Sequence, residues 1–342
     1  MRAARIHNYA SPLVIDDIPR PTPGPGQVLV RIAGSGFCHS DLHIIDGDLP
    51  ILPRMPYTLG HENAGYIDQL GESATAFAVG DPVVVYGGWG CGVCDMCVTG
   101  REQLCRTPRW AGVSDLDGGY AEYLLVQHER YLVPLHSLEP RDAAVYADAA
   151  LTPYRAVKRA LPFMTPDVPV LVIGIGGLGQ FGVKLLRELT GSEIIAVDVD
   201  EAKLQTAKEY GATYALDARD ADTAERIREI SGGFGVAAAF DFVGADSTLQ
   251  LAFAVTRSGG KVTQVGLAGG AVNFTLFTEV PFEVTFEGTL WGSIQELREV
   301  VALAECGRLT PIELEFVPLD EIQHAYEMLK AGKVAGRIVI MP

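Results

Sequence analysis

The sequence has few of the features that mark membrane, nucleic-acid-binding or disulfide-stabilised proteins. Its longest apolar stretch, residues 168–183, is interrupted by five glycines and is too short to span a bilayer. Basic residues are scarce: 27 Lys and Arg stand against 43 Asp and Glu, and the net charge of −16 would repel nucleic acid and anionic membranes. The first residues form no apolar run of the signal-peptide type. We therefore expect a cytoplasmic protein with neither kind of partner.

Cysteine is also sparse, and six in 342 residues make no disulfide scaffold. Four of them are crowded into a C-x2-C-x2-C-x7-C segment, which predicts a closed tetrahedral zinc site of the structural kind. Its cysteines are Cys91, Cys94, Cys97 and Cys105. An iron–sulfur cluster begins with the same spacing, but its fourth interval differs and Arg106, not proline, follows Cys105. Cys306, in an apolar helical segment, is expected only to pack.

The chain length and a change of pattern near residue 150 indicate two domains. Before that point, short apolar runs at 28–32, 81–86 and 120–126 alternate with Pro/Gly clusters, which predicts a β-rich domain. After it, strands alternate with amphipathic helices, and a doubly wound parallel sheet of six strands is expected. The predicted strands include 170–175, 193–199, 237–243, 261–267 and 284–291, and the helices include 178–190 and 201–210.

We assign residues 1–148 to the first domain and 149–291 to the second. The remaining tail, residues 292–342, contains two helical patterns at 294–306 and 320–330 and a terminal strand at 337–341. We expect this tail to pack back onto the first domain.

A G-x-G-x-x-G loop follows the apolar strand at 170–175 and opens the next helix, the context that a dinucleotide-binding loop requires. Gly174 suits the tight turn, Gly176 lets the backbone approach a pyrophosphate, and Gly179 allows helix and strand to pack closely. Asp198 ends the next strand, where a carboxylate binds the adenosine ribose and repels a 2′-phosphate, so NAD is favoured over NADP. The predicted coenzyme contacts in and after this loop also include Gly177, Leu178, Lys203, Val265 and Leu267.

Metal-ligating residues also follow apolar strands in the first domain. The segments Cys38-His-Ser-Asp-Leu-His43 and Gly60-His-Glu62 offer Cys38 and His61 to a catalytic zinc, which takes three protein ligands and keeps one open position. No further cysteine is free nearby. Asp148, where the chain enters the second domain, is the candidate third ligand.

These motifs together resemble the zinc-containing medium-chain alcohol dehydrogenase family over essentially the whole chain. The resemblance covers the Cys-His-Ser-Asp-x-His segment, the Gly-His-Glu segment, the four-cysteine lobe and the glycine loop. It implies a GroES-like β-rich first domain, a Rossmann second domain, an active site in the cleft between them and two zinc ions per chain. The family commonly uses cysteine as third ligand, so this sequence departs from it. The segment Asp148-Ala-Ala-Leu-Thr-Pro-Tyr154 is most similar to that of bacterial secondary-alcohol dehydrogenases.

The resemblance also implies roles for individual residues. The zinc would bind the alcohol oxygen and lower its pKa, hydride would pass to NAD, and the proton would leave through Ser40, the nicotinamide ribose and His43. Glu62 would tune the metal from beside a ligand. Thr152 is expected at the nicotinamide, and His39 and Arg337 at the pyrophosphate.

The substrate is less legible. Candidate pocket walls are Tyr57, Trp89, Leu290 and Trp291, although plain core is an equal reading of Trp89. Aromatic walls favour hydrophobic or arylalkyl alcohols. The alternatives are a polyol or amino-alcohol dehydrogenase of the same superfamily and an idle NAD-binding protein stabilised by zinc. We expect a homodimer or homotetramer, in which the strand at 284–291 pairs across a dimer.

Overall fold

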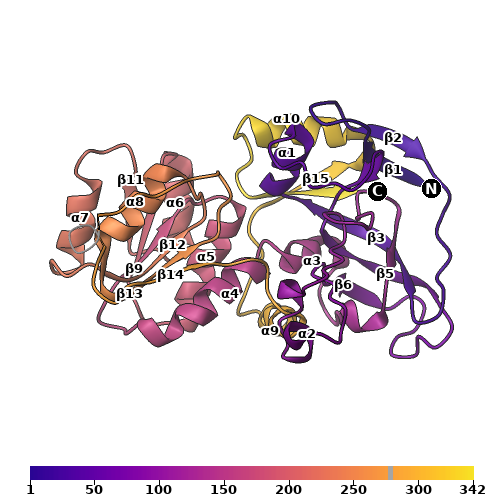
Figure 1. The fold of residues 1–342 in the computed structure, drawn as a ribbon, viewed down its shortest axis with the longest axis horizontal. Helices are drawn as coiled ribbons and strands as arrows, with labels where there is room; N and C mark the ends of the chain where they lie inside the picture. The colour runs from indigo at the N-terminus through magenta and orange to yellow at the C-terminus, as the bar shows by residue number, and fades with distance from the viewer. Residues whose placement is uncertain (276–279) are drawn as a thin grey trace. The chain divides into compact units, whose positions relative to one another are not determined.

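The structure is a computed structural model that describes residues 1–275 and 280–342. The chain divides into two compact units, Met1–Leu151 with Trp291–Pro342 (unit 1) and Thr152–Leu290 (unit 2). Figure 1 shows the mainly β character of unit 1 and the central sheet with flanking helices of unit 2. In the described part of the chain, no helix has the length and apolarity to cross a membrane.

Unit 1 is built on two sheets. The larger has the order β15-β16-β3-β5-β6-β8, with β7 also paired to β3, and the smaller has the order β2-β1-β4. The strands are β1 (Arg2–Ile6), β2 (Val14–Asp17), β3 (Val28–Phe37), β4 (Tyr57–Thr58), β5 (Glu62–Leu70), β6 (Pro82–Val85), β7 (Tyr123–Val126), β8 (Leu132–Pro134), β15 (Leu314–Pro318) and β16 (Arg337–Met341). Its helices are α1 (His39–Asp46), α2 (Asp95–Val98), α3 (Pro140–Ala143), α9 (Ile294–Glu305) and α10 (Ile322–Lys330).

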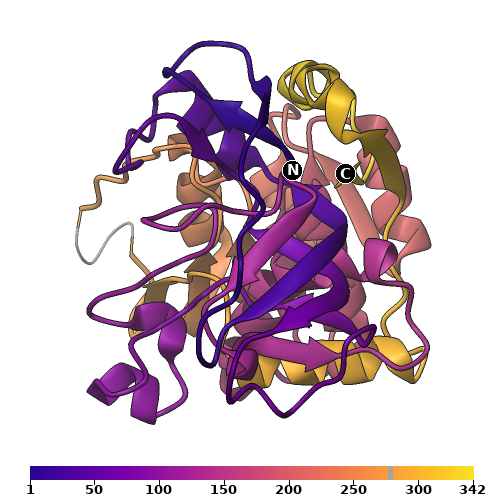
Figure 2. The ribbon, with the colours of Figure 1, turned by 90° about the vertical axis from the view of Figure 1, so that its right-hand side faces the viewer.

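The C-terminal tail is part of unit 1. Strand β16 pairs antiparallel with β3, so that Ile338 lies opposite Phe37, and β15 extends the same sheet. Figures 1 and 2 show this yellow segment beside the indigo N-terminal strands. The two tail helices and the last strand lie within two residues of the predicted bounds, whereas the sequence pattern missed β15.

Unit 2 is a parallel sheet of six described strands in the order β11-β10-β9-β12-β13-β14, the doubly wound arrangement that the alternation predicted. Its strands are β9 (Val170–Ile173), β10 (Ile194–Asp198), β11 (Tyr214–Asp217), β12 (Val236–Asp241), β13 (Thr256–Gln264) and β14 (Thr285–Gly288). Its helices are α4 (Leu151–Ala160), α5 (Gly177–Leu189), α6 (Glu201–Glu209), α7 (Thr223–Ile230) and α8 (Asp246–Val255). The order reverses between β10 and β12, on either side of β9. At that point the crevice beyond the strands' carboxyl ends receives ligands in such folds.

Candidate active site and metal centres

Four side chains from distant parts of unit 1 form a buried cluster. Their ligand atoms, on Cys38, His61, Glu62 and Asp148, all lie within 4.8 Å of one another. Asp148 Oδ2 is 3.8 Å from Cys38 Sγ and 3.6 Å from His61 Nε2. The structure thus brings together the three predicted ligands of the catalytic zinc.

Local structure places each ligand at the end of an element. Cys38 follows β3 and is the N-cap of α1, His61 directly precedes β5, and Asp148 ends the short 3-10 turn Ala144–Ala147. Because β3 and β5 pair antiparallel, with Gly36 opposite Glu62, the ends that carry Cys38 and His61 lie side by side. Asp148 then reaches the cluster from the last turn before α4.

Asp41, which was not predicted, lies beside two of these ligands and accepts a hydrogen bond from one of them. Its Oδ2 accepts the Cys38 amide at 2.9 Å and the Tyr120 hydroxyl at 2.6 Å, and its Oδ1 lies 3.4 Å from His61 Nδ1. A carboxylate behind the second ring nitrogen orients a ligating histidine and settles its tautomer. The available signal was an acidic residue three positions after Cys38, at the N3 position of the helix.

Arg337 lies at this cluster. Its buried guanidinium forms an ion pair with Glu62 and lies 4.0 Å from Asp148 Oδ2, and its predicted contact with a pyrophosphate stays a prediction. Strands β5 and β16 flank β3, and Gly36 on β3 leaves room for the Glu62 side chain between them. A Cβ on Gly36 would lie 1.9 Å from Glu62 Oε2. Arg337 therefore supplies the buried countercharge to Glu62.

The buried charges act on one another. The pKa of Cys38 falls below its ordinary value because the Arg337 charge and a hydrogen bond with His61 together outweigh burial, the largest single effect. Burial raises the pKa of Glu62 well above its usual range, and Arg337 only partly opposes this. Burial lowers the pKa of His61, but the Asp41 and Asp148 carboxylates outweigh it and the pKa rises.

The donor set fits zinc. A tetrahedral ion with bonds of about 2.0–2.3 Å separates its ligand atoms by roughly 3.3–3.8 Å, and the Cys38–Asp148 and His61–Asp148 distances agree with this range. One thiolate, one carboxylate and a neutral imidazole balance two positive charges. A zinc ion held by these three protein ligands would keep one coordination position for a substrate.

The four-cysteine lobe forms a second cluster. The Sγ atoms of Cys91, Cys94, Cys97 and Cys105 lie within 4.8 Å of one another, and three measured pairs are 3.6–3.9 Å apart. The S–S separation in a tetrahedral zinc–thiolate site is about 3.8 Å. Amides of Arg106 and Cys97 lower the pKa of Cys94 to about 6, whereas burial raises that of Cys97 to about 12. A metal there would displace protons.

The glycine loop has the form of a phosphate cradle. Gly174 has φ +84°, and a Cβ on Gly179 would lie 1.8 Å from the Gly174 carbonyl oxygen, so both positions require glycine. A Cβ on Gly176 would meet nothing within 4 Å, which leaves open space at the N-terminus of α5. The cradle fits a coenzyme pyrophosphate.

Asp198 supports this loop. Its Oδ2 accepts the Ile175 amide at 2.6 Å and its Oδ1 accepts the Asp200 amide at 3.0 Å. The other predicted coenzyme residues of unit 2 have mixed exposure: Thr152 and Val265 are buried, Gly177, Leu178 and Lys203 are half-buried, and Leu267 is exposed. His39 is exposed at the start of α1.

The relay candidates lie on α1. Ser40 is half-buried, two residues after Cys38, and His43 lies in the last turn of the helix. The Leu49 amide donates to the His43 carbonyl at 3.0 Å, and this turn brings Asp48 Oδ2 to 3.6 Å from His43 Nδ1. Asp48 was not predicted.

Among the predicted pocket walls, Trp291 lies at the metal cluster. Its ring meets His61 edge-on at 5.6 Å, and its Nε1 donates to the Ala147 carbonyl at 3.1 Å. Its φ of +50° is unusual for a bulky residue and indicates that surrounding contacts hold it there. Trp110, which the sequence analysis missed, packs edge-on against Trp291 at 5.9 Å, and its buried Nε1 has no hydrogen-bond partner among the described residues.

The other predicted walls stay predictions, and their surroundings are as follows. Trp89 is buried and stacks on Tyr131 at 5.7 Å, which supports the alternative that it is part of the core. Tyr57 is also fully buried, and its hydroxyl donates to the Leu116 carbonyl. Leu290 is partly exposed at the end of unit 2.

A doubly wound coenzyme fold joined to a β-rich unit with a Cys/His/Asp cluster defines the class of zinc-dependent, nicotinamide-linked oxidoreductases. Residues 24–137 match the family described as alcohol dehydrogenase GroES-like domain, and residues 177–305 match zinc-binding dehydrogenase. The chain belongs to the zinc-containing medium-chain alcohol dehydrogenases and is an NAD-dependent enzyme of that family. This confirms the predicted family, fold class and type of reaction.

Individual relatives agree over the full length. An NAD-dependent alcohol dehydrogenase of Sulfurisphaera tokodaii is 37% identical, with 100% of both chains covered. A D-arabinose 1-dehydrogenase (NADP(+)) of Saccharolobus solfataricus is 36% identical over 100% of this chain and 97% of that protein. The crystal structure of the alcohol dehydrogenase from Aeropyrum pernix is similar with a TM-score of 0.93 and 38% identity, and both chains are covered completely.

Proposed function

We propose that the protein reversibly oxidises small hydrophobic or aryl primary and secondary alcohols to aldehydes and ketones with NAD, using two zinc ions per chain. The observation that carries this proposal is the buried cluster of Cys38, His61 and Asp148 beside an indole wall. The four-cysteine cluster, whose spacing is that of a closed site, is the second zinc site.

Cys38, His61 and Asp148 hold the catalytic zinc. Bound there, the metal supplies Lewis acidity to a substrate hydroxyl. Asp41 orients the His61 ring, and Arg337 balances the charge of Glu62, so the ligands are presented in one arrangement. The carboxylate ligand makes this site harder in character than the usual one with two thiolates.

Ser40 and His43 carry the substrate proton away. The Ser40 hydroxyl, two residues after Cys38, would accept the proton, and the His43 imidazole would be the base that finally takes it. Asp48 faces His43 Nδ1, which leaves Nε2 as the accepting nitrogen. His43 side-chain exposure of 35% gives the proton access to solvent.

Two indoles define the substrate class. Trp291 packs edge-on against His61, and Trp110 packs edge-on against Trp291. Apolar rings beside the cluster suit an alkyl or aryl substrate group. The unpartnered Nε1 of Trp110 is a donor for a substrate oxygen. A sugar or polyol substrate is the second candidate, because a full-length relative is a D-arabinose 1-dehydrogenase.

NAD binds unit 2, with its pyrophosphate on Gly176 and the N-terminus of α5 and its adenosine ribose at Asp198. Thr152 contacts the nicotinamide. We assign residues 1–148 and 292–342 to the catalytic domain and 149–291 to the coenzyme domain.

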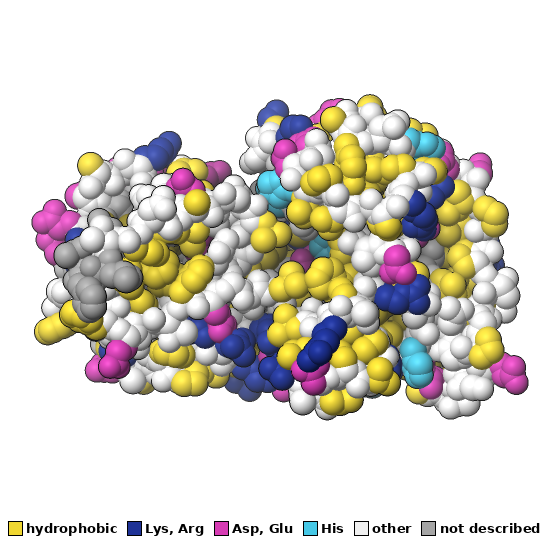
Figure 3. Space-filling view, in the orientation of Figure 1, with side chains coloured by type: hydrophobic (Ala, Val, Ile, Leu, Met, Phe, Trp, Pro, Cys, Tyr) yellow, Lys and Arg dark blue, Asp and Glu magenta, His cyan; other side chains and the backbone are white. Residues whose placement is uncertain are grey.

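The protein forms a homodimer or homotetramer through the edge strand β14. Apolar side chains gather on the face of unit 2 seen in Figure 3, and Phe282 and Phe286, around this strand, are largely exposed. Reduced zinc-binding thiols suit the cytoplasm.

The test is a panel of initial rates on aliphatic, aryl, polyol and aldopentose substrates with NAD and NADP, together with the zinc content per chain. We expect aryl and hydrophobic secondary alcohols to give the highest kcat/KM with NAD, and two zincs. Higher kcat/KM on sugars would replace the substrate assignment, and zinc without turnover on any substrate would favour an idle coenzyme-binding protein.

A further inference from the structure

Two carboxylates lie next to each other at the carboxyl edge of the unit 2 sheet. Asp198 ends β10 and Asp217 ends β11, and the two residues are register partners on parallel strands. Neighbouring strands are about 4.8 Å apart, and residues in register point to the same face. Asp217 therefore lies one strand away from the residue assigned to the adenosine ribose.

Asp217 binds the guanidinium of Arg219 through both carboxylate oxygens. Arg219 Nε lies 3.0 and 3.1 Å from the two carboxylate oxygens of Asp217, and its Nη2 lies 2.5 Å from Oδ2. The Arg219 amide also donates to Oδ1, at 2.8 Å, which closes a tight turn. This two-pronged pair lowers the pKa of Asp217 to about 2.

Arg219 lies near the end of β10, where Asp198 is assigned to the adenosine ribose. The Arg219 charge also interacts electrostatically with Asp220 and with Asp200, two residues after Asp198. The Ala218 amide donates to the Asp198 carbonyl at 3.0 Å, so the turn that carries Arg219 is attached to the end of β10. The side chain of Arg219 is 67% exposed, and it has room to turn if Asp217 releases it.

We propose that Asp217 is a second determinant of coenzyme choice: by holding Arg219, it withholds a guanidinium that would otherwise bind the 2′-phosphate of NADP. The proposal rests on the proposed function in taking Asp198 as the ribose residue. Arginine binds phosphate through two parallel hydrogen bonds, so a free Arg219 beside the ribose would favour NADP. Asp198 repels the 2′-phosphate, and Asp217 keeps the Arg219 guanidinium from binding it.

The test measures binding of two adenosine fragments that involve neither zinc nor the alcohol. Adenosine 2′,5′-bisphosphate and 5′-AMP are titrated by calorimetry into the wild type and into Asp217→Asn. Asparagine keeps the acceptor for the Arg219 amide but loses the charge that grips the guanidinium. We expect roughly tenfold tighter binding of the bisphosphate and unchanged binding of 5′-AMP.

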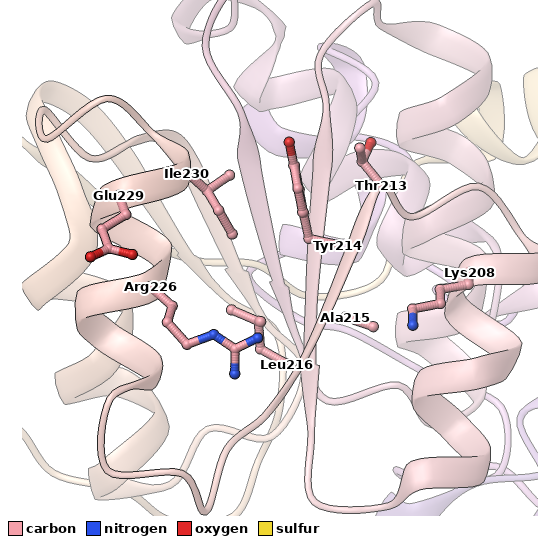
Figure 4. Close-up of a pocket in the computed structure, with 8 residues that line it drawn as sticks. All are labelled: Lys208, Thr213, Tyr214, Ala215, Leu216, Arg226, Glu229 and Ile230. Atoms are coloured by element: carbon pink, nitrogen blue, oxygen red, sulfur yellow. The ribbon is translucent and has the colours of Figure 1, made fainter.

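Two variants control for charge and for the arginine. Asp220→Asn removes the same charge from the same turn. Asp220 lies 3.6 Å from Arg226, a residue of α7 that Figure 4 labels, so in this variant Asp217 still holds Arg219. Arg219→Gln in the Asp217→Asn background should abolish the gain. Asp198→Gly with Asp217→Asn should bind the bisphosphate more tightly than either single variant.

The kcat/KM ratio of NADP to NAD should follow the same order. The proposal is overturned if Asp220→Asn gives the same gain as Asp217→Asn, or if the gain survives loss of Arg219. Because the fragments report on unit 2 alone, a protein that binds them as expected but oxidises no alcohol would refute the proposed function and leave Asp217 in its role.

Discussion

The two candidate metal clusters of unit 1 differ in how far apart their residues lie in the sequence. Cys91, Cys94, Cys97 and Cys105 span fifteen positions, and their lobe is partly open to solvent. The residues of the other cluster come from positions 38, 61, 62 and 148 and are all buried. A local cluster is complete once its loop forms around a metal, whereas a distributed cluster exists only after β3, β5 and the turn before α4 have packed. The first suits stabilisation and the second suits chemistry.

The largest expected effect is on turnover in the distributed cluster. Asp148→Ala should lower kcat roughly a thousandfold, because the Lewis acid is lost, and leave about one tightly held zinc per chain. NADH binding, followed by fluorescence, should be largely kept. Asp142→Ala is the control, since Asp142 pairs only with its exposed neighbour Arg141 among the described ion pairs. Two retained zincs with near-normal kcat would mean that the third ligand lies elsewhere.

The local cluster should respond in stability first. Cys91→Ser should lower the melting temperature by roughly 10 °C and reduce the zinc content by about one, because metal binding there is coupled to folding. The matched control is Cys306→Ser, which changes an exposed cysteine outside both clusters. Calorimetry and metal analysis give the readout. An unchanged melting temperature with full zinc content would show that the lobe is not a zinc site.

The relay should show a smaller, pH-dependent effect. His43→Gln should slow alcohol oxidation at least about tenfold below about pH 8 and less above it, since hydroxide then replaces the imidazole base. The pH profile of kcat checks this, with Asp48→Asn as a companion that keeps the imidazole but removes the group facing Nδ1. A His43→Gln profile parallel to the wild type would exclude His43 as the base.

The smallest expected effect is the order in which activity and thermal stability are lost when zinc is removed. Under equilibrium dialysis against a chelator, activity should be lost before thermal stability, because a carboxylate is a weaker zinc donor than a thiolate. The exposure of Cys91 and the burial of Asp148 oppose this order kinetically, so early time points test access and late ones test affinity. If stability falls first even at equilibrium, ligand softness does not separate the two sites.

The sequence by itself determined the features that depend on short spacing. The four cysteines, the glycine loop with Asp198 and the alternating strands and helices of unit 2 were legible because ligand spacing, turn geometry and periodicity act over a few residues. Even so, the short edge strand β11 was not located individually, and β15 was missed.

Only the tertiary structure decided which distant residues meet. Asp41 lies beside His61, Arg337 pairs with Glu62, and Trp110 packs against Trp291. No characteristic spacing in the sequence predicts these contacts. Each depends on how β3 lies between β5 and β16 or on how a loop packs against a buried ring. A buried charge needs its partner within a few ångströms in space, and the order of residues along the chain does not record that distance.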